Sequence, residues 1–181
     1  TLYREGFRVD ERELTLAPST LEYGVTIVAS LANHFLARDR SVGFLAYSRA
    51  REVIPADRGE RQLAKILETL AVIRADGQIP LGEIITAEAT HLRRNTTLIV
   101  VTATDQPYWI AACRDVAQRG VRVVAVLVDP QGFGHVRSSE RLANELSVSG
   151  IPTYLVREGD ELDQALAQPF ARAITPVGRT F

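Results

Sequence analysis

The chain has 181 residues, of which 46% are hydrophobic and 24% charged, and its net charge is −1 at pH 7. This length and composition allow one well-packed domain and argue against a disordered chain. Because acidic and basic residues are interspersed and nearly balanced, we expect no basic face and no nucleic-acid partner. The single cysteine, Cys113, excludes an internal disulfide and any zinc site built from several cysteines.

The first 18 residues carry many charges, and Val9, Leu14 and Leu16 alternate with them only in part. This pattern predicts a weakly structured arm or edge strand at 1–18, followed by a single domain at 19–181. The sequence has no methionine and no apolar run of membrane-spanning length. We therefore expect a soluble piece of a longer protein.

A long helix is predicted to begin near Ser19, with Ser19 or Thr20 as N-cap, and its apolar residues recur at helical spacing up to Leu36. Two short strands follow, at 41–48 and 51–56. Only a few residues separate them, whereas a parallel crossover needs a dozen or more, so they must form an antiparallel hairpin. Such a hairpin belongs at the edge of a mostly parallel sheet.

The remainder of the chain alternates predicted helices and apolar strands. The helices are expected at about 58–77, 80–94, 107–118, 138–150 and 159–170, and the strands at 97–103, 121–128 and 151–156. This alternation with short links indicates a parallel sheet covered by helices on both faces. The expected fold class is therefore α/β: a three-layer α/β/α arrangement around a doubly wound, mostly parallel sheet with one antiparallel edge strand.

Polar residues follow the apolar strand at 97–103, where the carboxyl ends of parallel strands commonly bind ligands. Thr104 or Asp105 can cap the helix that begins near Pro107, with Tyr108 and Trp109 partly buried in its first turn. The same side chains can instead line a binding surface. Both interpretations are open from the sequence.

A second polar stretch surrounds Gly59, where Asp57, Arg58, Glu60 and Arg61 lie close together in sequence. Asp57 is placed to cap the helix that follows, with a local ion pair beside it. The alternative is a surface that docks a partner.

Signals of catalysis are weak. No G-x-S-x-G nucleophile elbow follows a strand, and the three histidines have no metal-ligand spacing. The glycines at 132 and 134 lack the third glycine of a dinucleotide fingerprint and the Lys-Ser/Thr of a P-loop. We therefore expect a protein that is not an enzyme and that uses neither a cofactor nor a metal ion.

Four stretches between Ser19 and about Phe133 carry a family resemblance. They are STLEYGVTIVASLANHFL, SVGFLAYS with IPADRGERQLAKILETLAVIRADG, PLGEIITAEATHLRRNTTLIVVT, and RGVRVVAVLVDPQGFG. In order and spacing they resemble a bacterial von Willebrand factor A-like (vWA) family known as domain of unknown function 58 (DUF58). The resemblance implies a Rossmann-like, doubly wound sheet with one antiparallel edge strand.

Von Willebrand A domains hold Mg²⁺ at a metal-ion-dependent adhesion site (MIDAS), built from a D-x-S-x-S motif, a threonine and an aspartate. The resemblance implies that this site is degenerate here. Ala17 takes the place of the first aspartate, and Ser19 alone remains of that motif. Ile79 replaces the threonine, and Thr104 replaces the last aspartate, with Asp105 one residue late. Mg²⁺ prefers carboxylate oxygens, so such a site would bind it poorly.

We therefore expect a non-catalytic protein-interaction module of a larger, membrane-anchored bacterial protein, on the cytoplasmic side of the membrane. The residues expected to bind the partner are Ser19, Thr20, Gln78, Thr104, Asp105, Asp57 and Arg58. Because family members often occur beside MoxR-type AAA+ ATPases, the resemblance implies such an ATPase as partner.

Two alternatives use the same end of the sheet. A metal-dependent adhesion domain needs Asp105 to reach inward beside a second carboxylate, such as Asp10. A hydrolase or nucleotide-binding enzyme needs a convergent set of titratable residues with perturbed pKa values there.

Overall fold

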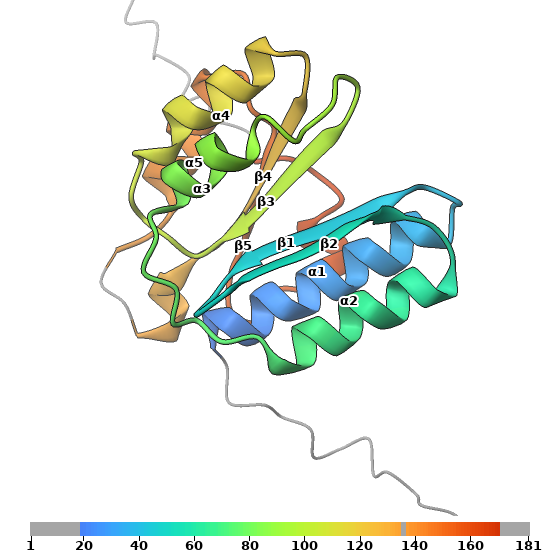
Figure 1. Ribbon diagram of the computed structural model, residues 1–181. Coiled ribbons are helices and arrows are strands. Elements are labelled where there is room, and N and C mark those ends of the chain that lie inside the picture. Colours follow the sequence, from blue (N-terminus) through green and yellow to red (C-terminus); the bar gives the residue numbers. More distant parts are fainter. Residues whose placement is uncertain (1–18, 135–136, 171–181) are drawn as a thin grey trace, which may run out of the picture.

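The computed structural model describes residues 19–134 and 137–170 (Figure 1). The predicted alternation of helices and strands is confirmed. In chain order the elements are α1 (Thr20–Leu36), β1 (Val42–Tyr47), β2 (Arg51–Asp57), α2 (Glu60–Val72), α3 (Leu81–Glu88), β3 (Thr97–Thr102), α4 (Trp109–Gln118), β4 (Arg122–Val128), the 3₁₀ helix η1 (Pro130–Phe133), α5 (Glu140–Val148), β5 (Thr153–Val156) and α6 (Leu162–Ala165). The arm expected at residues 1–18 lies outside the described residues.

The strands form two sheets. Strands β3, β4 and β5 pair in parallel in that order, and β1 pairs with β2 in the predicted antiparallel hairpin. We expected one sheet. Over residues 19–134 and 137–170 the hairpin is instead a separate two-stranded sheet, because β1 and β3 are not hydrogen-bonded to each other.

Helices cover both faces of the parallel sheet, and β4 shows why. Its all-apolar sequence sends alternate side chains to opposite faces. Val123, Ala125 and Leu127 pack in a cluster with α3, α4 and α5. Val126 and Val128 pack on the other face with α1 and α6. Figure 1 shows α3, α4 and α5 on one side of this sheet and α1 on the other.

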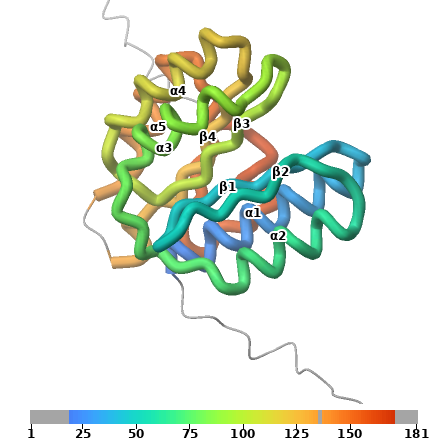
Figure 2. Tube along the Cα trace, in the orientation of Figure 1, coloured from blue at the N-terminus to red at the C-terminus, as the bar shows by residue number. Residues whose placement is uncertain are grey.

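Helix α1 also packs against the hairpin. Its last turns contribute Ala32 and Leu36 to a third cluster, which α2 completes with Ile66 and Leu70. The buried Gln62 of α2 donates hydrogen bonds to the carbonyl oxygens of Val42 and Pro55, at 2.7 and 2.8 Å. Helix α1 therefore lies beneath both sheets, whereas α2 covers only the hairpin (Figure 2).

The contacts of α1 fix the direction of β1. At its start, Tyr23 stacks edge-on against Phe133, which follows β4, and its hydroxyl accepts a hydrogen bond from Gly159 N, after β5. Beyond its other end, Asp39 pairs with Arg58. Strand β1 begins at that second end and therefore runs parallel to β3, β4 and β5. We call the end that holds the carboxyl ends of these four strands the rim.

Two helix caps differ from the expectation. Of the two N-cap candidates, Ser19 and Thr20, it is Ser19 that caps α1, because its side chain accepts a hydrogen bond from Glu22 N at 3.1 Å. Asp57 does not cap α2, because Gly59 at φ 82° turns the chain before the helix and Asp57 accepts from Arg58 N instead. Neither Thr104 nor Asp105 caps α4, whose N-cap position is Tyr108 without a side-chain hydrogen bond.

None of the helices in the described part of the chain is long and apolar enough to cross a membrane.

Candidate binding surface

The end of β3 forms the first part of the rim. The side chain of Thr102 accepts a hydrogen bond from Thr104 N at 3.2 Å, and that of Thr104 accepts from Gln106 N at 3.3 Å. Asp105 accepts from the side-chain amide of Gln106 at 2.8 Å and lies 3.7 Å from Arg137. These residues shape a tight loop of side chain-to-backbone turns, so the polar residues after β3 fold the loop rather than begin the helix.

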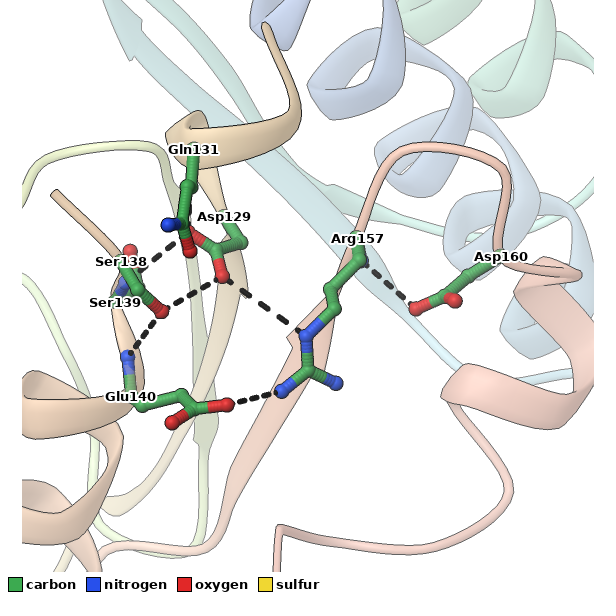
Figure 3. Close-up of polar contacts among 7 residues, drawn as sticks. All are labelled: Asp129, Gln131, Ser138, Ser139, Glu140, Arg157 and Asp160. Atoms are coloured by element: carbon green, nitrogen blue, oxygen red, sulfur yellow. Dashed lines mark hydrogen bonds and ion pairs between the residues drawn. The ribbon is translucent and has the colours of Figure 1, made fainter. Parts of the chain in front are cut away.

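Asp129, directly after β4, is the buried carboxylate of the rim and is only 2% exposed (Figure 3). One of its oxygens accepts hydrogen bonds from the backbone N–H groups of Gln131 and Ser139, at 3.2 and 3.1 Å. The other accepts from the Ser138 hydroxyl at 2.9 Å. Asp129 therefore ties the start of η1 to the start of α5, and its oxygens are occupied by donors within the protein.

Arg157, directly after β5, completes this network (Figure 3). Its Nε lies 4.0 Å from the Asp129 oxygen that accepts the hydrogen bond from Ser138, and its guanidinium donates to Glu140 at 2.6 Å. Its own backbone N–H donates to Asp160 at 2.8 Å. The ends of β4 and β5 and the first turn of α5 are thus held together by charge-assisted hydrogen bonds and by the longer ion pair between Arg157 and Asp129.

Two apolar side chains are exposed beside this polar rim. Tyr108 is 82% exposed and Ile79 is 50% exposed. They come from neighbouring segments, because Gly82 at the start of α3 packs against Tyr108 and Trp109. We expected Tyr108 and Trp109 both to be partly buried, and this was wrong for each. Trp109 is enclosed in the core, whereas Tyr108 faces solvent.

The structure brings five of the predicted binding residues to the rim and leaves two elsewhere. Ser19 and Thr20 begin α1, Thr104 and Asp105 follow β3, and Gln78 is exposed next to Ile79. Asp57 and Arg58 lie at the opposite end of α1, where Arg58 contacts Asp39 at 3.1 Å. Since a helix of 17 residues is about 25 Å long, these two belong to a different surface.

A polar cluster that sequence reasoning missed links the hairpin to α3. Glu88 is 8% exposed and accepts hydrogen bonds from the Tyr47 hydroxyl at 2.7 Å and from two nitrogens of Arg51 at 2.6 and 2.8 Å. These donors, Arg51 first, lower the pKa of Glu88 from 4.5 to about 2. The same hydrogen bond to Glu88 raises the pKa of Tyr47. The sequence does contain a signal of this cluster. Glu88 lies on the same helical stripe as Leu81 and Ile85, so a charged residue stands on the apolar face of the helix.

The remaining candidate groups lie away from the rim or apart from one another. Cys113 is buried in the core, and burial raises the pKa of its thiol to about 12, which disfavours the reactive thiolate. Within residues 19–134 and 137–170, no group of three or more His, Cys, Asp or Glu side chains is placed to hold a metal ion.

Comparison with known proteins gives one informative result. No protein-family model matches the chain, and no curated protein matches it. Among solved structures, the chain is similar to the pilus adhesin SpaC from Lactobacillus rhamnosus GG in its open conformation, with a TM-score of 0.59 and 11% sequence identity. The match covers 81% of this chain but only 27% of the adhesin chain. At this identity the likeness supports a shared α/β fold and nothing about activity.

Proposed function

We propose that this chain is a non-catalytic protein-interaction module that binds a protein partner through the rim. The observation that carries the proposal is the combination of two exposed apolar side chains, Tyr108 and Ile79, with a polar rim whose carboxylate Asp129 is already occupied. Exposed aromatic and aliphatic side chains bordered by polar groups are typical of protein-binding surfaces. A catalytic site would need a free, convergent set of reactive groups.

The proposal includes the finer fold and family of the sequence analysis. We infer a three-layer, vWA-like arrangement of the DUF58 kind, in which the hairpin is the antiparallel edge of one doubly wound sheet. Support comes from the helices on both faces of β3–β5 and from α1, which packs beneath both sheets. In this arrangement the rim corresponds to the degenerate MIDAS end of the domain.

A metal-dependent adhesion site would need Asp105 to reach inward beside a second carboxylate such as Asp10, and Asp10 lies outside the described residues. Asp105 is engaged by Gln106 and Arg137, and the positions expected for a threonine and a carboxylate hold Ile79 and Thr104. This environment supports binding of a protein without a metal ion. The partner that we propose, from the family resemblance alone, is a MoxR-type AAA+ ATPase, and the module would belong to a larger, membrane-anchored bacterial protein.

The test is affinity purification of the natural full-length protein, with mass spectrometry of the proteins that co-purify. We expect a MoxR-type ATPase to be captured by the wild type and lost from the double variant Tyr108→Ser, Ile79→Ser. The matched control is Val148→Ser, because Val148 is 72% exposed but lies at the far end of α5. Equal capture by the wild type and the rim variant would refute the proposed surface.

A further inference from the structure

Four exposed arginines gather at the end of the domain opposite the rim. Arg93 and Arg94 lie in the turn before β3, and Arg119 and Arg122 lie on either side of the turn that enters β4. Because β3 and β4 are parallel, both turns lie at the amino ends of their strands, away from the rim (Figure 1). We call these four residues the arginine patch.

Backbone hydrogen bonds hold the two turns of the patch side by side. The N–H of Asn95 donates to the carbonyl oxygen of Gly120 at 3.1 Å, and the N–H of Arg122 donates to that of Thr96 at 2.9 Å. The side-chain stem of Arg94 lies 3.4 Å from the position that a Cβ on Gly120 would take. The charges of the patch are therefore placed together by the ordered backbone of the sheet.

Nearby carboxylates do not balance this charge. The segments 89–96, 116–121 and 146–152, which lead into the three parallel strands, contain no Asp or Glu. The carboxylates that flank them are Glu88, which is buried and paired with the hairpin, and a single exposed one, Asp115 on α4. The ion pairs found among the described residues all use arginines outside the patch.

The patch also corrects an expectation from the sequence. The interspersed charges and the net charge of −1 led us to expect no basic face. This was wrong for the amino end of the parallel sheet, because the fold brings together arginines that are distant in the chain. The other end of the sheet carries the opposite charge, since the exposed Glu158, Asp160 and Glu161 follow β5 at the rim. The domain is therefore basic at one end and acidic at the other.

The composition of the patch discriminates between anionic partners. None of the large apolar side chains that are exposed in the described residues belongs to its two turns, so it offers no apolar anchor for a protein. Residues 89–96 and 116–122 also contain no aromatic side chain on which the bases of a single-stranded nucleic acid could stack. Lipid headgroups need only positive charge, and guanidinium groups suit their phosphates. These features favour an anionic lipid surface.

We propose that the arginine patch docks on an anionic lipid surface and turns the rim away from the membrane. The two charged ends of the domain support this orientation, because an anionic surface attracts the patch and repels the acidic rim. Each basic residue near such a surface strengthens binding by about fivefold, so the four together contribute several hundredfold. This goes beyond the proposed function, because it assigns a second surface and leaves the rim free for its partner.

The experiment measures co-sedimentation of the purified 181-residue chain with vesicles. One set is an equimolar mixture of phosphatidylcholine and phosphatidylglycerol, and the other is phosphatidylcholine alone. We expect binding to the first set, weakened by added salt, and none to the second. The double variant Arg93→Gln, Arg122→Gln should bind the anionic vesicles about 25-fold more weakly, whereas Arg93→Lys, Arg122→Lys should bind like the wild type.

The matched control removes the same charge from another face. Arg61 and Arg74 are exposed at the two ends of α2, which packs on the hairpin and not on the parallel sheet, so Arg61→Gln, Arg74→Gln should leave binding nearly unchanged. Equal losses in the two glutamine variants, or equal binding to the neutral vesicles, would overturn the proposal. Tighter binding of duplex DNA or polyglutamate at the same concentration of negative charge would also overturn it.

The orientation is tested by a fluorescent label at either end of the domain. Cys113 is buried, so a maleimide dye reaches an introduced cysteine, at Thr97→Cys beside the patch or at Tyr108→Cys on the rim. We expect anionic vesicles with a nitroxide quencher on their headgroups to quench the label at position 97 and not the label at position 108. Equal quenching at both positions, or stronger quenching at position 108, would contradict the proposed docking.

Discussion

Glu88 occupies the apolar stripe of α3 that also carries Leu81 and Ile85, and it is the anchor between that helix and the hairpin. Arg51 donates two hydrogen bonds to the Glu88 carboxylate, and the Tyr47 hydroxyl donates a third. A carboxylate with these partners is stabilised in its charged form, which is why its pKa falls to about 2. The folded state therefore binds a proton at Glu88 less readily than the unfolded chain does.

This difference predicts a pH-dependent contribution to stability. Because the folded pKa is below the unfolded one, the contribution is complete above about pH 4.5 and is lost as the pH falls toward about 2. We expect Glu88→Gln to cost about 1–2 kcal/mol at pH 7, since Arg51 is half exposed and partly screened. The cost should shrink steadily below pH 4.5 in urea unfolding curves.

The exposed Glu68 provides the matched control for this measurement. Glu68→Gln should leave the urea midpoint within about 0.5 kcal/mol of the wild type at every pH. A Glu88→Gln deficit that stays constant from pH 7 to pH 2 would show that the ion pair is not its cause.

The rim carboxylates lead to a prediction about Mg²⁺. Asp129 accepts three hydrogen bonds, and Asp105 contacts Gln106 and Arg137. Mg²⁺ would have to displace these partners as well as its own waters. A saturating ligand at about one hundred times its dissociation constant would stabilise the fold by about 2.7 kcal/mol. We expect a thermal melt in excess Mg²⁺ to show no shift relative to a monovalent salt of equal ionic strength. An upward shift that Asp105→Ala abolishes would restore the adhesion-site alternative.

Single residues were predictable from the sequence where their partners are local. The cap of α1 could be narrowed to Ser19 or Thr20, because the partner of Ser19, Glu22 N, is three residues away. Glu88 was missed because its partners are 37 and 41 residues away, and only the folded hairpin brings them to α3. The caps expected at Asp57 and at Thr104 or Asp105 were wrong because local turns intervene before α2 and α4.

At the scale of elements, the spacing of the apolar residues was enough to predict which segments form helices and which form strands. The short link between β1 and β2 correctly predicted the hairpin, since no crossover fits in it. Element ends were less predictable, because packing rather than propensity sets them. The last helix was expected at about 159–170, yet α6 spans only Leu162–Ala165.

Two glycines allow a test of how tightly the elements are joined. A Cβ on Gly24 of α1 would meet nothing within 4 Å, so Gly24→Ala should stabilise the protein by about 0.5–1 kcal/mol through helix propensity. A Cβ on Gly77 would lie 2.5 Å from the carbonyl oxygen of Tyr47, so Gly77→Ala must push the loop before α3 away from the end of β1. We expect a loss of about 1–3 kcal/mol in urea unfolding. If Gly24→Ala and Gly77→Ala shift the urea midpoint in the same direction, the close approach of Gly77 to the Tyr47 carbonyl does not restrict the residue at position 77.

At the scale of the molecule, the sequence predicted the α/β class but not the separation into two sheets. Periodicity shows which strands are apolar, but it does not show which strands are neighbours. The similarity to part of the SpaC adhesin agrees with the α/β class at 11% identity. The rim itself follows from topology, because the carboxyl ends of parallel strands meet at one end of a sheet. The exposure of Tyr108 and the burial of Trp109 do not follow from the sequence. Of two adjacent aromatic residues at the start of a helix, the sequence does not show which one faces the core and which one faces solvent.

The measurement that most directly tests the account is the dissociation constant between the purified full-length protein and a MoxR-type ATPase, for the wild type and the variants Tyr108→Ser and Val148→Ser. An interface anchor typically contributes 2 kcal/mol or more, which corresponds to about 30-fold in affinity. We predict that Tyr108→Ser weakens binding by about 30-fold or more, while Val148→Ser leaves it unchanged and both variants keep the wild-type unfolding midpoint. Equal dissociation constants for Tyr108→Ser and the wild type would contradict the claim that the rim is the binding surface.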